Sequence, residues 1–224
     1  MKITLIIPAL NEAGSIGPLL AEVPAGAVDE VIVVDNGSTD DTASAAQTAG
    51  ARVVSEPRRG YGYACAAGMQ AATGDVLVFM DGDGSFVPSE LADLLAPLRN
   101  GTADLVLGTR FAGGMTPGAM PPHQLFGNRL VAWLLGHLYG LEITDLGPFR
   151  AIRRDLLISW GMKERTYGWP VEMMVKAARR KAKIVEVPVS YRPRSAGQSK
   201  VGGTLRGTLF ATYRILSVTF RYAL

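Results

Sequence analysis

The architecture follows from one segment, Val76-Leu77-Val78-Phe79-Met80-Asp81-Gly82-Asp83. Its first part is apolar without interruption, which is typical of a strand buried on both faces, as in a parallel sheet. Asp81 and Asp83 follow directly, so we expect them where the strand leaves the sheet, at the edge where open α/β folds bind ligands. Because adjacent carboxylates repel each other and hard divalent cations prefer carboxylate oxygens, the segment predicts a metal site at this edge.

Similar apolar segments alternate with helical patterns along the chain. Such alternation predicts a doubly wound, mostly parallel α/β sheet flanked by helices. A segment rich in Gly, Pro and Met, over residues 112–122, is predicted to be a mobile loop. The expected strands are 2–8, 30–35, 51–55, 76–80, 103–108 and 184–189, and the expected helices are 15–22, 39–49, 63–72, 88–98, 124–139 and one that ends near 181.

Composition bounds the class of protein. A chain of 224 residues with 48% hydrophobic residues favours one large domain with a full core. The single cysteine, Cys65, excludes an internal disulfide framework and is typical of a reducing compartment. Met1 leads directly into a strand pattern, so no signal peptide is expected. The uncharged apolar segment over residues 130–141 is too short to span a bilayer.

Charge is unevenly distributed along the chain. Residues 1–150 hold 8 Lys and Arg against 16 Asp and Glu, whereas residues 151–224 hold 15 against 4. The acidic part suits a metal, and the basic part suits phosphates or an anionic membrane surface. Nucleic acid is not an expected partner, because no nucleic-acid-binding motif or aromatic stacking platform accompanies the basic residues.

Acidic residues follow three of the expected strands. Glu12 lies after the first strand, Asp35 ends the second, and the Asp81–Asp83 pair follows the fourth. The ends of parallel strands converge on one edge, so these carboxylates are expected together. A cationic loop over residues 191–200 could close over them and neutralise a diphosphate. This combination indicates a nucleotide diphosphate as ligand.

These residues also allow simpler interpretations. Asp81-Gly82-Asp83 could be an ordinary turn, and loop cations are often only solvated. An EF-hand calcium loop that starts at Asp81 would place Phe86 where glycine is required and Ala92 where glutamate is required, so that pattern does not fit. His123 and His137 are isolated, and the sequence shows no Ser/His/Asp or Cys/His triad.

The residues resemble family-2 glycosyltransferases of the GT-A fold, and among them the dolichol- and polyprenyl-phosphate sugar transferases. The resemblance covers nearly the whole chain, and it is specific because six modest motifs occur in the family's order. They are Ile7-Pro8-Ala9-Leu10-Asn11-Glu12, Val33-Val34-Asp35-Asn36-Gly37-Ser38, Asp81-Gly82-Asp83, Gly108-Thr109-Arg110-Phe111, Gly147-Pro148-Phe149-Arg150 and Arg194-Ser195-Ala196-Gly197-Gln198-Ser199-Lys200.

The resemblance implies a role for particular residues. Asp81 and Asp83 would form the D-x-D motif that holds Mg²⁺ or Mn²⁺, with Asp83 in direct contact. Arg110 would face the transferring sugar and the acceptor phosphate, and it completes the catalytic set with the two acids. Asn128 and Arg129 would orient the acceptor phosphate. The nucleotide-sugar site would comprise Pro8, Leu10, Glu12, Asp35, Asn36, Gly60, Asp81, Gly82, Asp83, Arg194, Ser199 and Lys200.

Two positions depart from the family pattern. Asn36 stands where a second Asp often follows Asp35, and the short Ser85 stands where a longer polar side chain usually follows the D-x-D motif. Both leave the base and the sugar undefined. The expected reaction is transfer of a hexose, with inversion, from a UDP- or GDP-sugar to a polyprenyl phosphate. A phosphate acceptor is already ionised near pH 7, which agrees with the lack of a catalytic histidine.

The C-terminal segment predicts an amphipathic helix. Leu205, Leu209, Tyr213, Leu216 and Phe220 share one arc of a helical projection, with Arg206, Arg214 and Arg221 beside it. This pattern is typical of a helix at a membrane interface, although a packed surface helix has the same signature. The expected location is the cytoplasmic face of the membrane. We expect one catalytic domain over 1–203, with a nucleotide-binding half over 1–111 and an acceptor-side half over 112–203, and the helix over 204–224.

Other functions remain open from the sequence alone. A glycosyltransferase with a sugar or lipid hydroxyl acceptor would need a carboxylate base, for which Asp145 and Glu172 are available. A sugar nucleotidyltransferase would usually carry a cationic phosphate loop after the first strand, where residues 9–14 hold no cation. A non-catalytic nucleotide-sugar or membrane-binding module is the third alternative. The oligomeric state, including a homo-oligomer, is left open.

Overall fold

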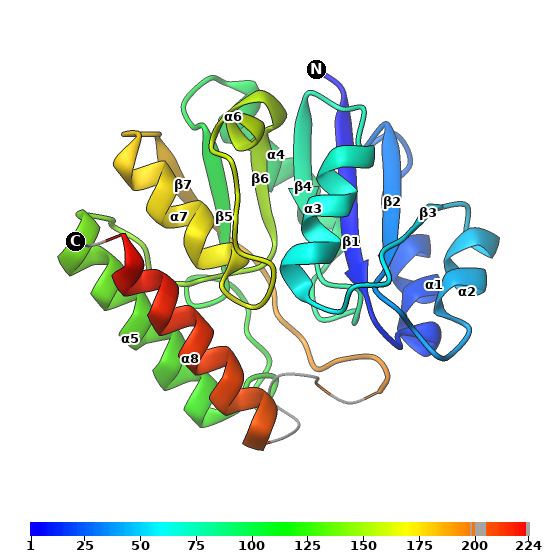
Figure 1. The fold of residues 1–224 in the computed structure, drawn as a ribbon. Coiled ribbons are helices and arrows are strands. Elements are labelled where there is room, and N and C mark those ends of the chain that lie inside the picture. The colour runs from blue at the N-terminus through cyan, green and yellow to red at the C-terminus, as the bar shows by residue number, and fades with distance from the viewer. Residues whose placement is uncertain (198, 200–204, 223–224) are drawn as a thin grey trace.

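The computed structural model describes residues 1–197, 199 and 205–222, with the side chains of 205 and 206 excepted. A seven-stranded sheet runs through the molecule in the order β3-β2-β1-β4-β6-β5-β7 (Figure 1). Every neighbouring pair is parallel except the pairs that involve β6. This is the mostly parallel α/β sheet that the sequence predicts. The strands are β1 (Ile3–Ala9), β2 (Glu30–Asp35), β3 (Arg52–Ser55), β4 (Val76–Phe79), β5 (Leu105–Thr109), β6 (Arg150–Arg153) and β7 (Ile184–Pro188).

Strand β6 is the strand that the sequence analysis did not predict. It lies antiparallel between β4 and β5, with Phe79 opposite Arg150 and Leu107 also opposite Arg150. The strand is short, and an arginine stands at each of its ends, so neither a long apolar run nor a clear alternation marks it. It joins the strand before Asp81 to the strand before Arg110, and so it sets the spacing between the two.

Helices cover both faces of the sheet (Figure 1). Alternate residues of each central strand point to opposite faces, as in Leu77 and Val78 of β4. One core packs Leu77 and its equivalents against α3, α6 and α7, and the other packs Val78 and its equivalents against α1, α2 and α4. The helices are α1 (Ala13–Ala21), α2 (Thr42–Thr48), α3 (Tyr61–Ala71), η1 (Pro88–Glu90), α4 (Leu91–Arg99), α5 (Pro122–Tyr139), α6 (Arg154–Ser159), α7 (Trp169–Arg179) and α8 (Leu205–Arg221).

The last helix, α8, packs beside α5 and α7 at one side of the molecule (Figure 1). Polar contacts fix its inner face. Arg214 donates to both oxygens of the buried Glu164 at 2.8 Å, and the Tyr222 hydroxyl donates to Glu172 at 2.9 Å. Arg214 therefore differs from the expectation, because it turns toward the protein and not toward a membrane. Among the described helices, none is both long and apolar enough to cross a bilayer.

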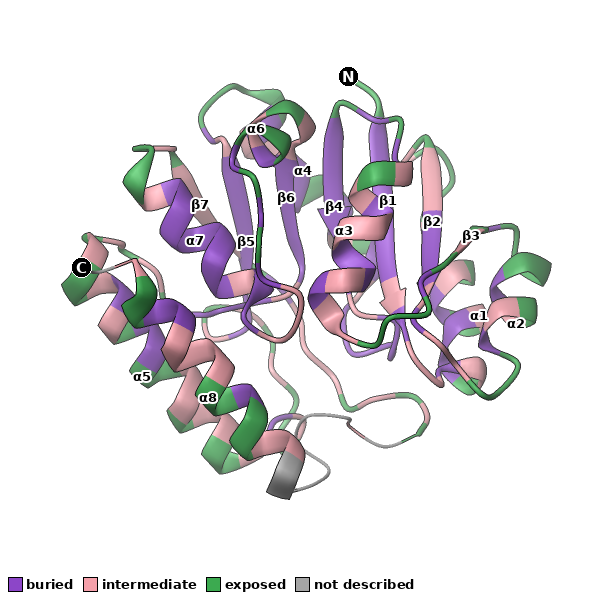
Figure 2. Cartoon of the chain, viewed as in Figure 1, coloured by how far each residue is buried: buried purple, intermediate pink, exposed green. Residues whose placement is uncertain are grey.

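Much of the outer face of the α5–α8 pair is exposed (Figure 2), and it carries several large apolar side chains. Phe126 and Trp133 of α5 are 70% and 62% exposed, and Tyr213 of α8 is 65% exposed. Leu209 and Phe220 of the predicted arc are also exposed, whereas Leu216 packs against the core. Leu205 and Arg206 of the same projection have no described side chains.

Candidate active site

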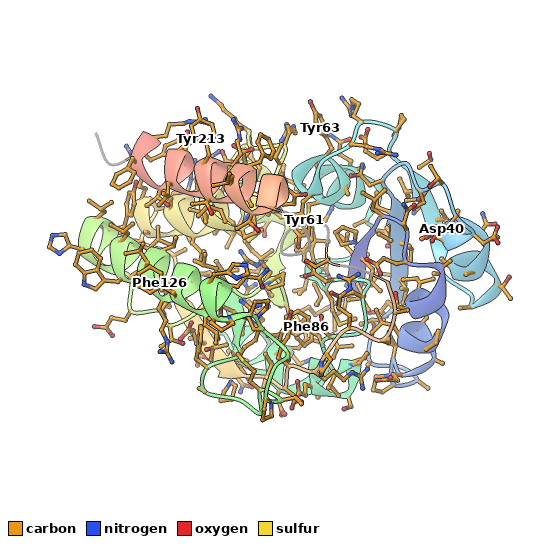
Figure 3. The ribbon with its side chains drawn as sticks, turned by 90° about the horizontal axis from the view of Figure 1, so that it is seen from below. Asp40, Tyr61, Tyr63, Phe86, Phe126 and Tyr213 are labelled. Carbon is orange, nitrogen blue, oxygen red and sulfur yellow. The ribbon has the colours of Figure 1, made fainter. Side chains whose placement is uncertain are left out.

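The predicted carboxylates do converge on the carboxyl edge of the sheet. In the register of β1 and β2, Ala9 lies opposite Asp35, and in that of β1 and β4, Ile6 lies opposite Phe79. Glu12 and the Asp81–Asp83 pair therefore leave neighbouring strands on the same side. Figure 3 looks onto this edge from below, with Phe86 near the middle. The parallel arrangement of β2, β1 and β4 is thus what brings the acids together.

A single arginine joins two of these acids. Arg194 donates from Nη1 to Asp83 Oδ2 at 2.9 Å and from Nη2 to Glu12 Oε1 at 2.6 Å. Both carboxylates are buried, and Arg194 itself is mostly covered. The Ser15 hydroxyl lies 2.9 Å from Glu12 Oε2. The cationic loop predicted to hold the donor diphosphate therefore lies over the acid edge in this structure.

Backbone contacts hold the same loop in place. Ser195 donates its N–H to the Asp83 carbonyl at 3.0 Å, and Arg192 donates from Nε to the Gly84 carbonyl at 2.6 Å. Arg192 also forms an ion pair with Glu22 at 2.8 Å. Gly84 has a φ of +76°, and a Cβ atom there would lie 2.5 Å from Ser195 Oγ. Only glycine allows both this backbone conformation and the close approach of the loop.

Asp81 and Asp83 meet the requirements of a divalent cation. Desolvation, and then the charge of Asp83, raise the pKa of Asp81 to about 7. A cation relieves that repulsion, and the Arg194 guanidinium occupies a position on Asp83 where positive charge is stabilised. Within the described residues, no group of three His, Cys, Asp or Glu side chains gathers around one point. Diphosphate oxygens and water are further ligands that a cation held by this pair would accept.

Ser85, one of the two departures from the family pattern, is committed to this pair. Its N–H donates to Asp83 Oδ1 at 3.0 Å, and its hydroxyl donates to the same oxygen. Asp83 therefore has one carboxylate oxygen held by Ser85 and the other held by Arg194. The short Ser85 side chain thus fixes the orientation of the Asp83 carboxylate, which gives a structural reason for serine at this position.

The residues predicted for the nucleoside lie on the β1–β2 side of the edge. Asp35 accepts from the Ser38 N–H at 3.1 Å and remains partly exposed. Asn36 is buried, and its amide binds the carbonyls of Glu56 and Arg58 while its oxygen accepts from the Gly60 N–H. Its side chain therefore holds the loop that leads into α3. Pro8, Leu10 and Gly82 lie at the ends of β1 and β4.

Arg110 lies at the end of β5 on the opposite side of the acid pair. It is buried, and Asp145 binds it at three points: Nε to Oδ2 at 2.7 Å, Nη2 to Oδ1 at 2.6 Å, and the backbone N–H to Oδ2 at 3.0 Å. Burial alone would lower the pKa of Arg110, but the hydrogen bonds and charge of Asp145 raise it. Its guanidinium also lies over the ring of Tyr191, 5.0 Å from the centroid.

The two residues predicted to orient the acceptor lie on α5. The Asn128 oxygen is 3.4 Å from Arg110 Nη2, so Asn128 borders the site directly. Arg129 is exposed and lies over the ring of Phe111 at 5.1 Å. Ser199 is partly exposed, and Lys200 lies outside the described residues.

Two residues of the site were missed or assigned differently. Asp145 was predicted as a possible base, but it is fully buried and bound to Arg110. Tyr191 bridges the loop over residues 112–121 to the acid edge through Met115 and Phe86, and no sequence pattern marks it. The aspartate two residues before a Gly-Pro-Phe-Arg motif is a signal that could have linked Asp145 to the site.

Comparisons with known proteins agree with this geometry. The model of glycosyl transferase family 2 matches residues 4–161. A glycosyltransferase of Mycobacterium tuberculosis is 43% identical over 211 residues, covering 93% of this chain and 94% of that protein. The undecaprenyl-phosphate mannosyltransferase of Micrococcus luteus is 36% identical, covering 92% and 90%.

Solved structures show the same architecture. Glucosyl-3-phosphoglycerate synthase of M. tuberculosis, in complex with Mn²⁺ and UDP-glucose, superposes with a TM-score of 0.80 at 26% identity. The match covers 99% of this chain and 79% of that one. The same synthase is also known with Mg²⁺ and UDP. From its sequence, its sheet and the edge that carries its acids, the chain belongs to glycosyl transferase family 2 and has the GT-A fold.

Proposed function

We propose that the enzyme transfers a hexose, with inversion, from a UDP- or GDP-sugar to a polyprenyl phosphate, with Mg²⁺ or Mn²⁺ as cofactor. Asp83, with Asp81, would hold the cation, and Arg194 with the rest of its loop would hold the diphosphate. Glu12, Asp35, Pro8 and Leu10 would form the nucleoside site. Membership of a glycosyltransferase family argues against a nucleotidyltransferase or a non-catalytic module.

One observation carries the choice of acceptor: the acceptor side of the site presents a buried cation whose carboxylate partner is fully engaged. Asp145 accepts four hydrogen bonds, three from Arg110 and one from the Leu146 N–H. Asp145 therefore has no capacity left to take a proton from a hydroxyl. Arg110 suits an anion, and a phosphate monoester is an anion that needs no base.

The second proposed base is also occupied. Glu172 is buried, accepts from the backbone N–H groups of Lys163 and Glu164, and pairs with Lys176 at 2.8 Å. Through these contacts Glu172 holds α7 to the preceding segment, and through the Tyr222 hydroxyl it holds the end of α8. A hydroxyl acceptor therefore has neither of the carboxylates that the sequence offered for it. The names of relatives also support a polyprenyl-phosphate acceptor. One is the dolichyl-phosphate hexose transferase of Haloferax volcanii, which is 34% identical over 202 residues.

The chemistry left to the protein is positioning and electrostatics. The cation, when bound, neutralises charge that develops on the leaving diphosphate. Arg110 would align the attacking phosphate oxygen with the anomeric carbon, and Arg194 would stabilise the departing diphosphate from the other side. Holding both partners in one buried site converts a bimolecular encounter into an oriented reaction.

The same proposal includes attachment to the membrane surface where a polyprenyl phosphate resides. The exposed aromatic side chains of α5 and α8, Phe126, Trp133 and Tyr213 among them, suit the interfacial region of a bilayer. Phe126 lies two residues from Asn128 on α5, which supports a membrane surface near the acceptor side of the site. We propose peripheral attachment to the cytoplasmic face, with residues 1–203 as the catalytic domain.

A donor and acceptor panel tests the proposal. UDP- and GDP-hexoses would be incubated with Mg²⁺ or Mn²⁺ and with either undecaprenyl phosphate in detergent or 3-phosphoglycerate, the acceptor implied by the neighbouring synthase. The expected result is hexose transfer to the lipid phosphate, lost in Asp83→Ala and retained in the exposed control Asp93→Ala. Transfer only to phosphoglycerate, or full activity of Asp83→Ala, would overturn the acceptor or the metal assignment respectively.

A further inference from the structure

The segment that carries Asp145 is itself held by a carboxylate from another strand. Glu186, on β7, accepts from the Thr144 N–H at 2.8 Å and from the Asp145 N–H at 3.1 Å through Oε1. Its second oxygen accepts from the Thr144 hydroxyl at 2.8 Å. Every one of these contacts falls on Thr144 or Asp145. Glu186 therefore pins the backbone at the position from which Asp145 reaches Arg110.

The hydroxyl contacts extend this network to β5. Thr144 Oγ1 and Thr109 Oγ1 are 2.7 Å apart. A hydroxyl has one proton, and that of Thr144 is directed at Glu186, so the Thr109 hydroxyl donates to Thr144. Thr109 immediately precedes Arg110 at the end of β5. Arg110 is thus held from two directions, through its chain neighbour and through Asp145.

We propose that Glu186 is a positioning residue for the transfer reaction, acting on Arg110 through Thr144 and Asp145. The inference rests on the proposed role of Arg110 at the acceptor phosphate. Asp145 binds Nε and Nη2 of the guanidinium, while Nη1 makes no hydrogen bond to the residues that the structure describes. Nη1 is the corner left for substrate, and its direction depends on where Asp145 lies.

A purely local role for Glu186 would be to satisfy loop amides. A larger effect is expected because Asp145 is fully buried and accepts four hydrogen bonds, three of them from Arg110. When Glu186 is lost, the exposed Thr144 amide binds water instead, whereas the part-buried Asp145 amide loses its acceptor and shifts toward another. Since the bidentate pair moves as a unit, the shift is passed to Arg110.

The test uses the full-length enzyme with Glu186→Ala, Glu186→Gln and the remote control Glu30→Ala. Glu30 forms a comparable network, with the hydroxyls of Thr4 and Thr73 and the N–H of Thr73, at the far end of the sheet. We expect Glu186→Ala to lower kcat roughly tenfold while the donor KM and the affinity for UDP with Mn²⁺ stay within about twofold. Glu30→Ala should lower the Tm without lowering kcat.

Two further comparisons distinguish positioning of Arg110 from a general loss of stability: the conservative variant Glu186→Gln, and Glu186→Ala in an enzyme that already carries Arg110→Lys. Glu186→Gln keeps an oxygen for the two N–H groups and should recover most of kcat. In an Arg110→Lys background, Glu186→Ala should cost less than about twofold, because the group on which it acts is gone. An equal loss in both backgrounds, or a kcat of Glu186→Ala within twofold of the wild type, would overturn the inference.

A spectroscopic readout separates this inference from the proposed function. The Arg110 Nε–H signal in ¹⁵N-labelled enzyme, assigned with Arg110→Lys, should shift in Glu186→Ala and not in Glu30→Ala. An unshifted signal would overturn the positioning role even if transfer to the lipid phosphate is observed. Full activity of Arg110→Lys would instead remove Arg110 from the proposed function, whatever Glu186 does to the signal.

Discussion

Arg110 and Arg194 lie on opposite sides of the Asp81–Asp83 pair. Arg110 forms its ion pair with a carboxylate outside the acid edge, whereas Arg194 forms its ion pairs with carboxylates of the edge itself. Arg110 is bound by Asp145, a fully buried carboxylate that is not part of the acid pair. Arg194 instead joins Asp83 to Glu12, the groups proposed for the metal and the nucleoside. The Arg110 side chain is 8% exposed and that of Arg194 is 22% exposed.

The difference separates a preorganised cation from an exchangeable one. Arg110 keeps its partner when substrates bind, because Asp145 is not proposed to touch them. Arg194 has to leave at least Asp83 before a divalent cation can take its place there. The acceptor side is therefore built in advance, whereas the donor side is completed only when the nucleotide sugar and its metal arrive.

The largest contrast is expected in stability. Asp145→Ala leaves the buried Arg110 charge unpaired and should lower the free energy of unfolding by about 3–5 kcal/mol, measured by urea denaturation. Asp83→Ala should cost less than about 1 kcal/mol, because Arg194 can turn toward solvent. The double variant Asp145→Ala/Arg110→Met should regain most of the loss. Equal effects of the two single variants would contradict the distinction between the arginines.

The next contrast is in catalysis. Arg110→Lys loses the fork that Asp145 orients, so kcat should fall by about 10²-fold with little change in the donor KM. Initial rates with varied donor at saturating acceptor measure both constants. The exposed Arg99→Lys at the end of α4 is the control and should change kcat less than about threefold. A rise in donor KM without a fall in kcat would place Arg110 on the donor side instead.

A smaller effect distinguishes the exchangeable arginine. Arg194→Ala removes the group that occupies Asp83, so Mn²⁺ alone should bind about fivefold more tightly, equivalent to about 1 kcal/mol. The same variant should bind the nucleotide sugar more weakly, because the diphosphate loses a cation. Titration of Mn²⁺ by electron paramagnetic resonance, with and without UDP, measures both. Weaker Mn²⁺ binding in the absence of UDP would refute competition at Asp83.

Arg214 of α8, which has no proposed ligand nearby, gives a reference for the contribution of a purely structural ion pair. Burial would raise the pKa of Glu164, but hydrogen bonds from Arg214 and Thr166 lower it below its ordinary 4.5. A lowered pKa in the folded state stabilises the protein above pH 4.5, and this contribution is lost as the pH falls through the folded-state value. Arg214→Ala should therefore cost about 1–2 kcal/mol at pH 7, and the difference from the wild type should shrink below pH 4.5. A constant difference across that range would contradict the pairing.

The sequence predicted the acid edge because its signal is local. An uninterrupted apolar run before Asp81 identifies a buried strand, and the parallel arrangement then determines which edge the carboxylates share. Arg110 was found only through the resemblance to a family. Its partner Asp145 was named only as an available base for the alternative hydroxyl acceptor, because nothing in the sequence shows that two residues 35 positions apart form an ion pair.

The remaining differences have the same physical origin. A helical projection places Arg214 beside the apolar arc, but it does not show that Glu164 lies opposite it. The exposed aromatic residues Phe126 and Trp133 of α5 were expected only as part of an apolar helix. Whether an apolar side chain of a helix faces the core or solvent depends on the neighbouring elements, which tertiary packing alone determines.

Strand β6 has a consequence for the order in which the chain acquires its structure. Strand β5 pairs with β6 and β7, both of which are synthesised after it. Strands β1 to β4 can associate as soon as they leave the ribosome, whereas the apolar β5 has to wait for residues 150–153. The side that carries the Asp81–Asp83 pair can thus form early in biosynthesis and the Arg110 side late. We expect the interval between them to be the period in which the nascent chain most needs protection from aggregation.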